Sequence, residues 1–366
     1  MAVIGAGIVG ASIGFYLSRM GAGVTIFEKN EPASGASGHS FAWINSFNKT
    51  PRSYHEFNHN SMERWARFER LLNHDIGLKW GGNACFTTSD SDGHRLKQNI
   101  ERLQSWGYPA RLIEKSELAD LEPGLKIPSI SAAGYTWADG HVMPERVVKA
   151  CINRIIETGG RILIDTYVDS IQQNSSSVYV ITDKEKHEFD VAVIAAGVNS
   201  TELGGSLNLK LPQRVSPGVV IKTDPMSNLL KSLSVLQIIS GEGEEHQIHI
   251  RQDKDGVVMI GMGSQEHELT DDSQSHAENL LLSASRYIPE LKNTKAIPIP
   301  VGYRPMPVDD HPIIGFSQKA PNVYVALMHS GVTLAPIVGE LASIEITGSG
   351  IVETLSPYRP SRFSHI

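Results

Sequence analysis

Three glycines and one acid near the start of the chain have the residue types and spacing that can hold a diphosphate. Gly5, Gly7 and Gly10 follow a short apolar stretch, and Glu28 ends a second apolar stretch. In this spacing the first glycine permits a tight turn, the second lets the backbone approach a pyrophosphate, and the third lets a helix pack closely on a strand. The N–H groups at the N-terminus of that helix then face the phosphates, and the acid accepts hydrogen bonds from ribose hydroxyls. The pattern predicts a dinucleotide site, and Glu28 disfavours the 2′-phosphate of NADP.

These residues need a strand–turn–helix–strand unit to position them. We expect a buried strand before the glycines, a helix over 11–20 after them, and a second strand before the acid. This order of elements distinguishes a dinucleotide-binding unit from a glycine-rich turn in another α/β fold. The predicted cofactor site also includes Ile8 and Val9, which lie between the glycines, and Lys29, which follows the acid.

Two further segments of small residues could bring the backbone close to a flat ligand. The first is the loop Ser34-Gly35-Ala36-Ser37-Gly38-His39, for which a flexible surface loop is the alternative interpretation. The second is the end of a predicted buried strand over 189–197, where Ala196 and Gly197 stand. We count both segments, together with Val168, among the predicted cofactor contacts.

The composition limits the class of protein. The chain has 366 residues, which is enough for two domains, and it is 40% hydrophobic and 20% charged, as in an ordinary soluble globular protein. Its net charge of −7 argues against a nucleic-acid or anionic-membrane partner. Cys85 and Cys151 are the two cysteines, and no cysteine or histidine cluster has the spacing of metal ligands. We therefore expect neither a disulfide framework nor a metal site.

The sequence also bears on location. No apolar run approaches the ~20 residues that a membrane span needs. The first predicted strand begins at residue 2, so we expect no signal or transit peptide and a cytoplasmic protein. Because this strand is short, whether native residues precede Met1 is left open, as is the oligomeric state.

Beyond the dinucleotide unit, the sequence changes from helical to extended patterns. Apolar residues recur every three or four positions over 51–75, which predicts a helix there. Further helices are expected over 94–106, which is polar, over 145–158, which ends before Gly159-Gly160, and over 275–287. Short apolar or alternating runs predict strands over 84–88, 161–164, 177–182 and 322–327. From about 201 to 300 the pattern is mostly alternation, with strands over 219–222, 247–251 and 257–260. This change predicts an antiparallel sheet in a second domain.

Several of these segments together resemble the FAD-dependent family of D-amino acid oxidase, glycine oxidase and sarcosine oxidase. The glycine motif is shared by many dinucleotide proteins, but two later motifs are more specific to the family. They are Gly302-Tyr303-Arg304-Pro305 with Pro312-Ile313-Ile314-Gly315, and Gly331-Val332-Thr333-Leu334-Ala335-Pro336. The segments 34–38, 191–200 and 355–363 match as well. The resemblance covers nearly the whole chain in the right order.

The resemblance implies FAD rather than NAD, and a fold that is α/β (α+β overall). A Rossmann-like FAD-binding domain would be assembled from residues 1–80, 138–205 and 300–366. A substrate domain with a mostly antiparallel sheet would comprise residues 81–137 and 206–299 and would lie over the flavin.

The final glycine motif has a physical interpretation in this context. The turn Met328-His329-Ser330-Gly331 leads into a predicted helix over 333–347. Backbone N–H groups and the positive end of the helix dipole would stabilise the anion formed when flavin is reduced. We count Ser330 to Thr333, with Val332 between them, as cofactor contacts, and expect Pro336 in the first turn, where proline costs no hydrogen bond. A plain strand-to-helix turn is the alternative.

The chain departs from the family at several places. The final turn lacks a Gly-His-Gly-type run, and no cysteine stands near Met328 for covalent flavin attachment. His39 lies close to where dimethylglycine-type enzymes attach flavin to a histidine, so covalent attachment is an alternative to dissociable FAD. His249 replaces a frequent tyrosine, and Met259 stands roughly where sarcosine oxidases carry an oxygen-activating lysine. The electron acceptor, oxygen or another carrier, is therefore left open.

The resemblance further implies oxidation of a C–N bond in a small-molecule amino acid or secondary amine. A hydride would pass to flavin N5, and the resulting imine would hydrolyse. Such chemistry requires positioning more than a protein base, so we name no catalytic base. Arg304 is the best candidate to bind a substrate carboxylate and is also counted as a cofactor contact; alternatively it ties down the 302–315 loop. Further substrate-binding candidates are His249, Arg251 and His329, although an exposed strand face would explain the first two almost as well.

Two other functions are open. The same scaffold could serve an FAD-dependent dehydrogenase of a hydroxy acid or polyol, because a fold does not fix the chemistry. The departures at Met328, His249 and Met259 would also suit a flavin-binding subunit without turnover of its own.

Overall fold

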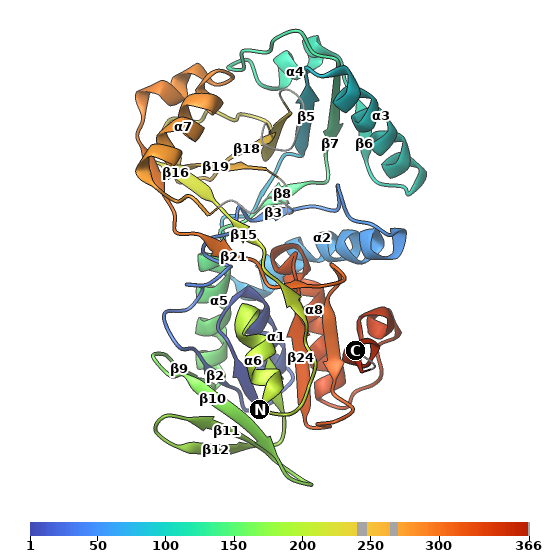
Figure 1. Cartoon of the computed structure of the whole chain (residues 1–366), viewed down its shortest axis with the longest axis vertical. Coiled ribbons are helices and arrows are strands. Elements are labelled where there is room, and N and C mark those ends of the chain that lie inside the picture. Colours follow the sequence, from blue (N-terminus) through green and yellow to red (C-terminus); the bar gives the residue numbers. More distant parts are fainter. Residues whose placement is uncertain (240–246, 264–269, 365–366) are drawn as a thin grey trace.

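The computed structural model describes residues 1–239, 247–263 and 270–364. Two large sheets lie in different parts of an elongated molecule, one in the lower part and one in the upper part of Figure 1. Residues 240–246 and 264–269 of the predicted substrate segment 206–299, and residues 365–366 of the segment 300–366, lie outside the described residues. The mixed α/β class expected from the sequence is confirmed.

The lower sheet has six strands in the order β23-β24-β13-β1-β2-β9. Their bounds are β1 (Ala2–Ile4), β2 (Thr25–Phe27), β9 (Arg161–Leu163), β13 (Ala192–Ile194), β23 (Ile313–Phe316) and β24 (Val323–Leu327). All pairs from β24 to β9 are parallel, and β23 is antiparallel to β24. Parallel strands of this kind are buried on both faces and are therefore apolar throughout, as β1 and β13 are.

Helices cover one face of this sheet and a small sheet covers the other. On the helical face, α1 (Ile8–Arg19) packs against both α5 (Pro144–Glu157) and α8 (Gly331–Ile346). On the opposite face lies the antiparallel sheet β10 (Val168–Gln173), β11 (Val178–Thr182) and β12 (Lys186–Phe189), at the bottom of Figure 1. Successive side chains of β1 separate accordingly: Val3 packs with the helices, whereas Ile4 packs with the small sheet.

The upper sheet has eight strands in the order β20-β16-β19-β18-β17-β5-β7-β6. Their bounds are β5 (Asn83–Thr87), β6 (Ala110–Leu112), β7 (Ala132–Thr136), β16 (Val220–Thr223), β17 (Val235–Ile239), β18 (Gln247–Gln252), β19 (Val258–Met262) and β20 (Ala296–Pro298). Neighbouring strands are antiparallel except for β17 and β5, whose parallel pairing joins the two chain segments. Three helices lie in the upper part of the molecule together with this sheet (Figure 1): α3 (Asp90–Ser105), α4 (Lys115–Leu121) and α7 (Gln274–Ser285).

Each large sheet draws its strands from separate chain segments. The lower sheet uses strands from 1–80, 138–205 and 300–366, and the upper sheet uses strands from 81–137 and 206–299. We propose that these segments form the FAD-binding and substrate domains, respectively.

Short strands join the two parts of the molecule. Near its middle lie the three-stranded sheet β3-β8-β4 and the pairs β15-β21 and β14-β22. Their bounds are β3 (Trp43–Ile44), β4 (Lys79–Trp80), β8 (Gly140–His141), β14 (Gln213–Arg214), β15 (Pro217–Gly218), β21 (Gly302–Tyr303) and β22 (Met306–Pro307). The described residues also form the short helix α6 (Ser200–Gly205) and the 3₁₀ helices η1 (Gly197–Asn199), η3 (Pro289–Asn293), η4 (Glu353–Tyr358) and η5 (Pro360–Phe363).

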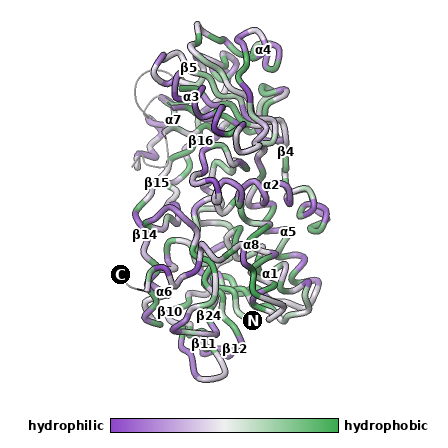
Figure 2. Tube along the Cα trace, turned by 90° about the vertical axis from the view of Figure 1, so that its right-hand side faces the viewer, coloured by the Kyte–Doolittle hydropathy of each residue, from purple (hydrophilic) through white to green (hydrophobic). Residues whose placement is uncertain are grey.

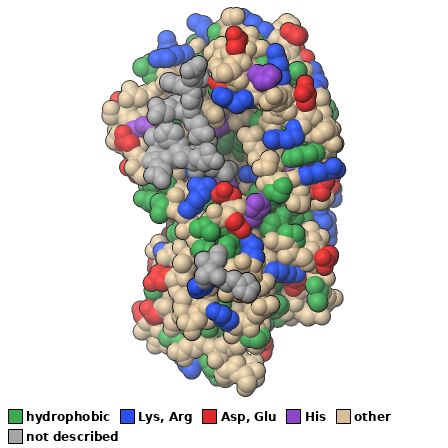
Figure 3. Space-filling view, turned by 45° about the vertical axis from the view of Figure 1, so that its right-hand side comes forward, with side chains coloured by type: hydrophobic (Ala, Val, Ile, Leu, Met, Phe, Trp, Pro, Cys, Tyr) green, Lys and Arg blue, Asp and Glu red, His purple; other side chains and the backbone are tan. Residues whose placement is uncertain are grey.

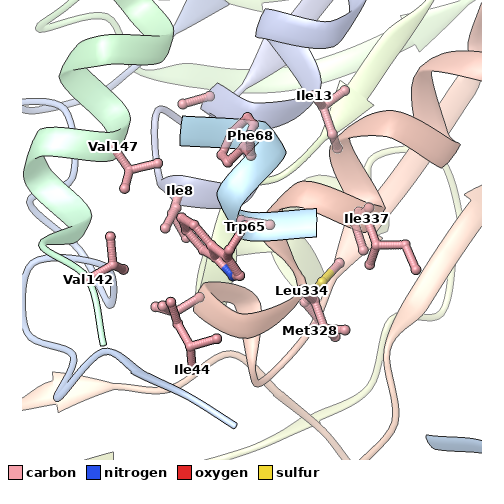
Figure 4. Close-up of a cluster of buried hydrophobic side chains, with 14 of the residues drawn as sticks. Ile8, Ile13, Ile44, Trp65, Phe68, Val142, Val147, Met328, Leu334 and Ile337 are labelled. Atoms are coloured by element: carbon pink, nitrogen blue, oxygen red, sulfur yellow. The ribbon is translucent and has the colours of Figure 1, made fainter. Parts of the chain in front are cut away.

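The long helix α2 (Arg52–Leu72) crosses the middle of the molecule (Figure 1). It is largely hydrophilic in Figure 2, in contrast to α8 and β24, because one face is solvated while the other carries aromatic side chains inward. Figure 4 shows Trp65 and Phe68 of this helix among side chains of α1, α5 and α8. The Ser61 hydroxyl and the Trp65 indole N–H also donate to the Thr333 carbonyl, at 2.7 and 3.2 Å. The aromatic stripe predicted for 51–75 thus fixes α2 onto the first turn of α8.

Several expectations from the sequence need correction. The helix expected over 11–20 begins at Ile8, and the buried strand expected over 189–197 is only β13, because the chain turns into η1 at Gly197, which has a φ of 57°. The strands β10 and β17 were not expected from the sequence. For β17 the reason is that the apolar run that contains it shows no alternation. Pro336 is not in the first turn: α8 begins at Gly331, so this proline is the sixth residue and supplies no N–H to the Val332 carbonyl.

Charged side chains of both signs are interspersed on the face shown in Figure 3. Within the described ranges, no helix is both long enough and apolar enough to cross a lipid bilayer.

Candidate active site

A cavity of about 760 Å³ lies where the two large sheets approach each other. Its wall runs from the glycine turn after β1, past the loop 33–49 and the start of α8, to strands β17, β18 and β19 of the upper sheet. A volume of this size suits a cofactor or a drug-sized ligand. The predicted cofactor residues line this cavity, apart from Gly10 and Gly38.

The glycine turn requires glycine at its first and third positions. Gly5 has a φ of 105°, and a Cβ there would lie 2.5 Å from the Ala195 carbonyl oxygen. A Cβ at Gly10 would lie 2.0 Å from the Gly5 carbonyl oxygen, so Gly10 acts through packing rather than by lining the cavity. Gly38 is similar, since its Cβ would lie 2.6 Å from the Ala33 carbonyl oxygen. The backbone can therefore approach a ligand closely at the N-terminus of α1.

The sequence predicts that Glu28 accepts hydrogen bonds from ribose hydroxyls, and in the structure it also has partners within the protein. One carboxylate oxygen accepts from the Ala6 N–H at 2.8 Å, and the other accepts from the Asn30 N–H at 3.0 Å. The carboxylate thus holds the glycine turn against the end of β2 while it lines the cavity. Ser37 fixes the other side of the turn, because its hydroxyl accepts from the Ile8 N–H at 3.0 Å.

The N-terminus of α8 faces the same cavity. Ser330 has a left-handed backbone with a φ of 57°, which turns the chain from β24 into the helix. The Thr333 hydroxyl accepts from the Asn45 N–H and donates to the Trp43 carbonyl, each at 3.3 Å. These bonds hold the segment that contains β3 beside the first turn of α8.

The family is decided by comparison with known proteins. The sequence model of the FAD-dependent oxidoreductase family matches residues 1–343. The chain belongs to this family. The resemblance to the D-amino acid oxidase type of flavoenzyme, expected from the motifs, is thereby confirmed.

Similar proteins align with nearly the whole length of this FAD-dependent oxidoreductase. An opine oxidase subunit of Agrobacterium tumefaciens (strain Ach5) is 25% identical over 99% of this chain and 97% of that protein. Glycine oxidase of Geobacillus kaustophilus (strain HTA426) is 24% identical over 99% of this chain and 96% of that protein. The crystal structure of glycine oxidase from Geobacillus kaustophilus superposes with a TM-score of 0.87 at 22% identity, covering 99% and 98% of the two chains, and so shares the fold.

The residues present fit FAD, because the glycine turn, Glu28 and the start of α8 line one cavity, and a Cβ at Gly7 would meet the Ser37 hydroxyl at 3.3 Å. We propose that Gly7, Ile8 and Val9 hold the diphosphate and that Glu28 and Lys29 contact the adenosine. For the flavin ring we propose the segments 34–39, 196–197 and 330–333, all of which contribute lining residues. His39 is among them, and dissociable rather than covalently attached FAD stays a prediction.

At the upper end of the cavity the predicted substrate-binding residues do not all come together. Arg304, His249 and His329 line the cavity, whereas Arg251 does not. The Arg251 side chain is buried behind Phe41 and donates to its carbonyl oxygen at 2.5 Å. Met259, the cross-strand neighbour of Arg251, is likewise buried, against Val220 and Ile299. We therefore propose that Arg251 ties the upper sheet to the segment that contains Phe41 rather than contacts the substrate.

Two of the histidines that line the cavity, His249 and His329, are neutral at pH 7. Burial, followed by the charge of Arg304, lowers the pKa of His249 to about 4. Burial, followed by the charges of Lys49, Arg304 and Arg214, holds the pKa of His329 well below its usual range. Neutral imidazoles can hydrogen-bond an amine without adding to the positive charge of the site.

Several cavity residues escaped the analysis of the sequence. Lys49 precedes α2 in a polar stretch without any motif, and Gln237 lies on the unexpected strand β17. Trp43 follows the small-residue loop in an uncharged stretch that matches no motif. The lack of alternation around β17 hid Gln237, and nothing local marks Lys49 as a buried cation.

A fully buried carboxyl group, Asp139, supports the Trp43 wall of the cavity. It accepts from the Trp43 indole N–H at 2.9 Å, from the Tyr108 hydroxyl at 2.6 Å and from the Thr136 hydroxyl at 2.8 Å. Burial raises the pKa of Asp139 to about 7, although these three donors act in the opposite direction. Trp43 is thus held in place by a network rather than by packing alone.

Proposed function

We propose that this FAD-dependent oxidoreductase oxidises the C–N bond of an amino acid or a secondary amine, and that the imine product hydrolyses to a carbonyl compound and an amine. The observation that carries the proposal is the presence of Arg304 beside two neutral histidines in the wall of the predicted FAD cavity. The names of the similar proteins, an opine oxidase subunit and a glycine oxidase, support the same substrate class.

The chain supplies binding and orientation for this reaction. Bound FAD supplies the acceptor for the hydride that leaves the carbon next to nitrogen. The Arg304 guanidinium can bind the substrate carboxylate through two parallel N–H donors. His249 or His329 can accept a hydrogen bond from the substrate amine, which then holds the amine lone pair and its neighbouring C–H in a fixed orientation. No general base is required of the protein.

An anaerobic screen tests the proposal. Purified FAD-loaded protein is mixed with D-amino acids, N-methyl amino acids and polyamines, and loss of the visible flavin absorbance is followed. We expect bleaching by at least one carboxylate-bearing amine, with the matching carbonyl product. Bleaching by hydroxy acids or polyols alone would favour the dehydrogenase alternative. If no compound of either class bleaches the flavin, a flavin-binding subunit without turnover becomes the better interpretation.

A further inference from the structure

Four residues that line the cavity stand in one row across the upper sheet. In the strand register, Gln237 of β17 is opposite His249 of β18. His249 is in turn opposite Gly261 of β19, and Gly261 is opposite Val220 of β16. All four residues line the cavity. Because neighbouring strands lie about 4.8 Å apart, the backbones at the two ends of this cross-sheet row are separated by about 14 Å.

Gln237 presents an amide group to the cavity at one end of the row. Only 6% of its surface is exposed, and its Oε1 accepts from the side chain of the fully buried Asn83 at 3.2 Å. Because the amide oxygen faces Asn83, Nε2 is left for another acceptor. In the described part of the chain Nε2 has no hydrogen-bond partner, yet it is not among the unpartnered atoms that the fold shuts off from solvent. It can therefore donate to a ligand in the cavity.

His249, the next residue of the row, packs beside two aromatic rings. Its ring centroid lies 6.0 Å from that of Phe41 and 6.3 Å from that of Trp43. Trp43 is fixed in turn, because its indole N–H donates to Asp139 at 2.9 Å. No residue within the described ranges is hydrogen-bonded to either imidazole nitrogen, and neither nitrogen is shut off from solvent. A neutral imidazole offers one donor and one acceptor, so this ring can complement an amide.

Arg304 lies at the opposite end of the row. Its guanidinium lies against Gly218, which is two residues before Val220. Both of these residues line the cavity, as Arg304 does. The proposed carboxylate contact and the Gln237 amide therefore face the cavity from opposite ends of the row, and no single small functional group can contact both.

The part of the row between these two ends offers space rather than a polar contact. Gly261 has no side chain, and a Cβ there would lie 3.3 Å from the Val220 side chain and 3.8 Å from that of Phe41. No side chain of the row is charged at pH 7, since burial lowers the pKa of His249 to about 4. A ligand lying along the row would thus pass an apolar stretch before it reaches uncharged polar groups.

We propose that Gln237 and His249 bind a primary amide at the far end of the substrate, so that the substrate is an amine with a carboxylate at one end and an amide at the other. The amide carbonyl would accept from Gln237 Nε2, and the amide N–H would donate to His249. A second carboxylate would meet no cation in this row, and an ammonium group would meet no carboxylate. This assignment leaves His329 as the partner of the amine. The carboxylate end rests on the proposed function, whereas the amide end rests on the row itself.

The length of the row gives the length of the substrate. Allowing about 3 Å for a hydrogen bond at each end leaves about 8 Å between the two end groups. An extended chain advances about 3.6 Å for every three bonds, so about seven bonds separate the carboxylate carbon from the amide carbon. Suberate monoamide has this length, whereas succinate monoamide is too short.

Three acids that differ at one end only test the inference in the FAD-loaded protein. They are suberate monoamide, suberate, and the analogue of the monoamide in which an isopropyl group replaces the amide. None of them carries an amine, so they report binding without oxidation. Calorimetric titration gives their dissociation constants and that of succinate monoamide. We expect suberate monoamide to bind at least about 10-fold more tightly than the isopropyl analogue, because that analogue leaves the polar groups of the site unpaired. Suberate and succinate monoamide should also bind more weakly.

Two variants separate binding from folding. Gln237→Met keeps the length of the side chain and removes the donor, but it leaves the buried Asn83 amide without its acceptor. Asn83→Leu combined with Gln237→Met removes both partners, which costs less stability. Both variants should reduce the preference for the monoamide over the isopropyl analogue to within about three-fold, with FAD content and affinity for the isopropyl analogue maintained. The control is Gln172→Met, since Gln172 is exposed on β10 outside the cavity wall, and it should keep the full preference.

The outcomes are distinguishable. Failure of suberate monoamide to bind, equal affinity for the monoamide and the isopropyl analogue, or a preference that survives both Gln237 variants would overturn the inference. Tighter binding of suberate than of its monoamide would also overturn it, because the far end would then prefer a charge. If the amide preference depends on Gln237 but no carboxylate-bearing amine bleaches the flavin, the amide site stands and the proposed amine oxidation fails.

Discussion

Replacing Arg304 tests whether the substrate is held by a carboxylate. The side chain donates from Nη1 to the Pro217 carbonyl at 2.8 Å and approaches the Ser216 hydroxyl at 3.5 Å. Its guanidinium lies over Gly218, where a Cβ would come within 2.2 Å of Nη2. These contacts tie the connection after β21 to β15 and fix the guanidinium in the cavity wall. Arg304 therefore has both a structural contact and a position suited to a substrate.

The two roles differ in magnitude. One hydrogen bond from a charged group to a carbonyl contributes about 1.5–3 kcal/mol to stability. A two-pronged ionic bond to a carboxylate in a dry pocket costs about 3–5 kcal/mol when one partner is removed. Since about 1.4 kcal/mol corresponds to a factor of ten, Arg304→Ala should raise KM for an amino-acid substrate at least ~100-fold. Arg304→Lys keeps the charge but loses the planar fork, so it should remain badly impaired.

The assay compares KM, kcat, FAD content and thermal unfolding for the variants. Arg214→Ala is the matched control, because Arg214 pairs with Asp310 outside the cavity wall yet acts on Arg304 through its charge. It should change KM by only a few-fold. Loss of FAD or of folding in Arg304→Ala would identify a purely structural tie. Normal turnover of an uncharged amine by that variant would refute the amino-acid class.

Three further predictions concern the cofactor and the fold. Glu28→Ala should weaken FAD binding by about 1–3 kcal/mol, because the Ala6 and Asn30 N–H groups lose their acceptors; an unchanged dissociation constant in a fluorescence titration would contradict this. The folded-state pKa of Asp139, about 7, lies above its unfolded value, so the free energy of unfolding should fall as pH rises from about 4 to about 7. In urea titrations over this pH range, Asp139→Asn should show a smaller dependence of the free energy of unfolding on pH. Arg359→Ala should destabilise the protein by about 3–5 kcal/mol, since it leaves the buried Glu345 carboxylate without its cation; a change below 1 kcal/mol on chemical denaturation would argue against the pair.

The sequence was informative where function depends on local backbone geometry. The glycine turn could be recognised because a positive φ at Gly5 and the close approach at Gly10 admit no other residue. The acid at the end of β2 could be recognised because the chain direction puts it at the same sheet edge. Helices such as α2 could be located because their apolar side chains recur with the helical period.

Other features could not be found because they depend on partners far away in the sequence. Lys49 is buried between the exposed residues Asn48 and Thr50, and it lines the same cavity as residues from distant segments, such as His329. Asp139 has a raised pKa only because segments distant in the sequence, among them those of Trp43 and Tyr108, bury it completely. Arg251 shares a strand face with His249 but is diverted to the Phe41 carbonyl, which no strand pattern can indicate.

The C-terminal segment 353–363 contacts three elements that carry or adjoin the cavity wall, and these contacts hold the elements in fixed positions relative to one another. Arg359 binds Glu345 on α8, and Arg362 binds Asp309 and the His311 carbonyl in the connection that follows Arg304.

The same segment reaches the helix that follows Lys49. The Tyr358 ring stacks on Phe57 of α2, with the ring centroids 4.9 Å apart. One short stretch, η4 and η5, therefore fixes α8, the 302–315 connection and α2 relative to one another. These elements carry or adjoin the proposed flavin contacts at the start of α8, the proposed carboxylate contact Arg304 and the cavity residue Lys49. Hydride transfer requires substrate and cofactor in a fixed relative position. Because η4 and η5 contact all three elements, we expect this stretch to position the substrate site relative to the flavin.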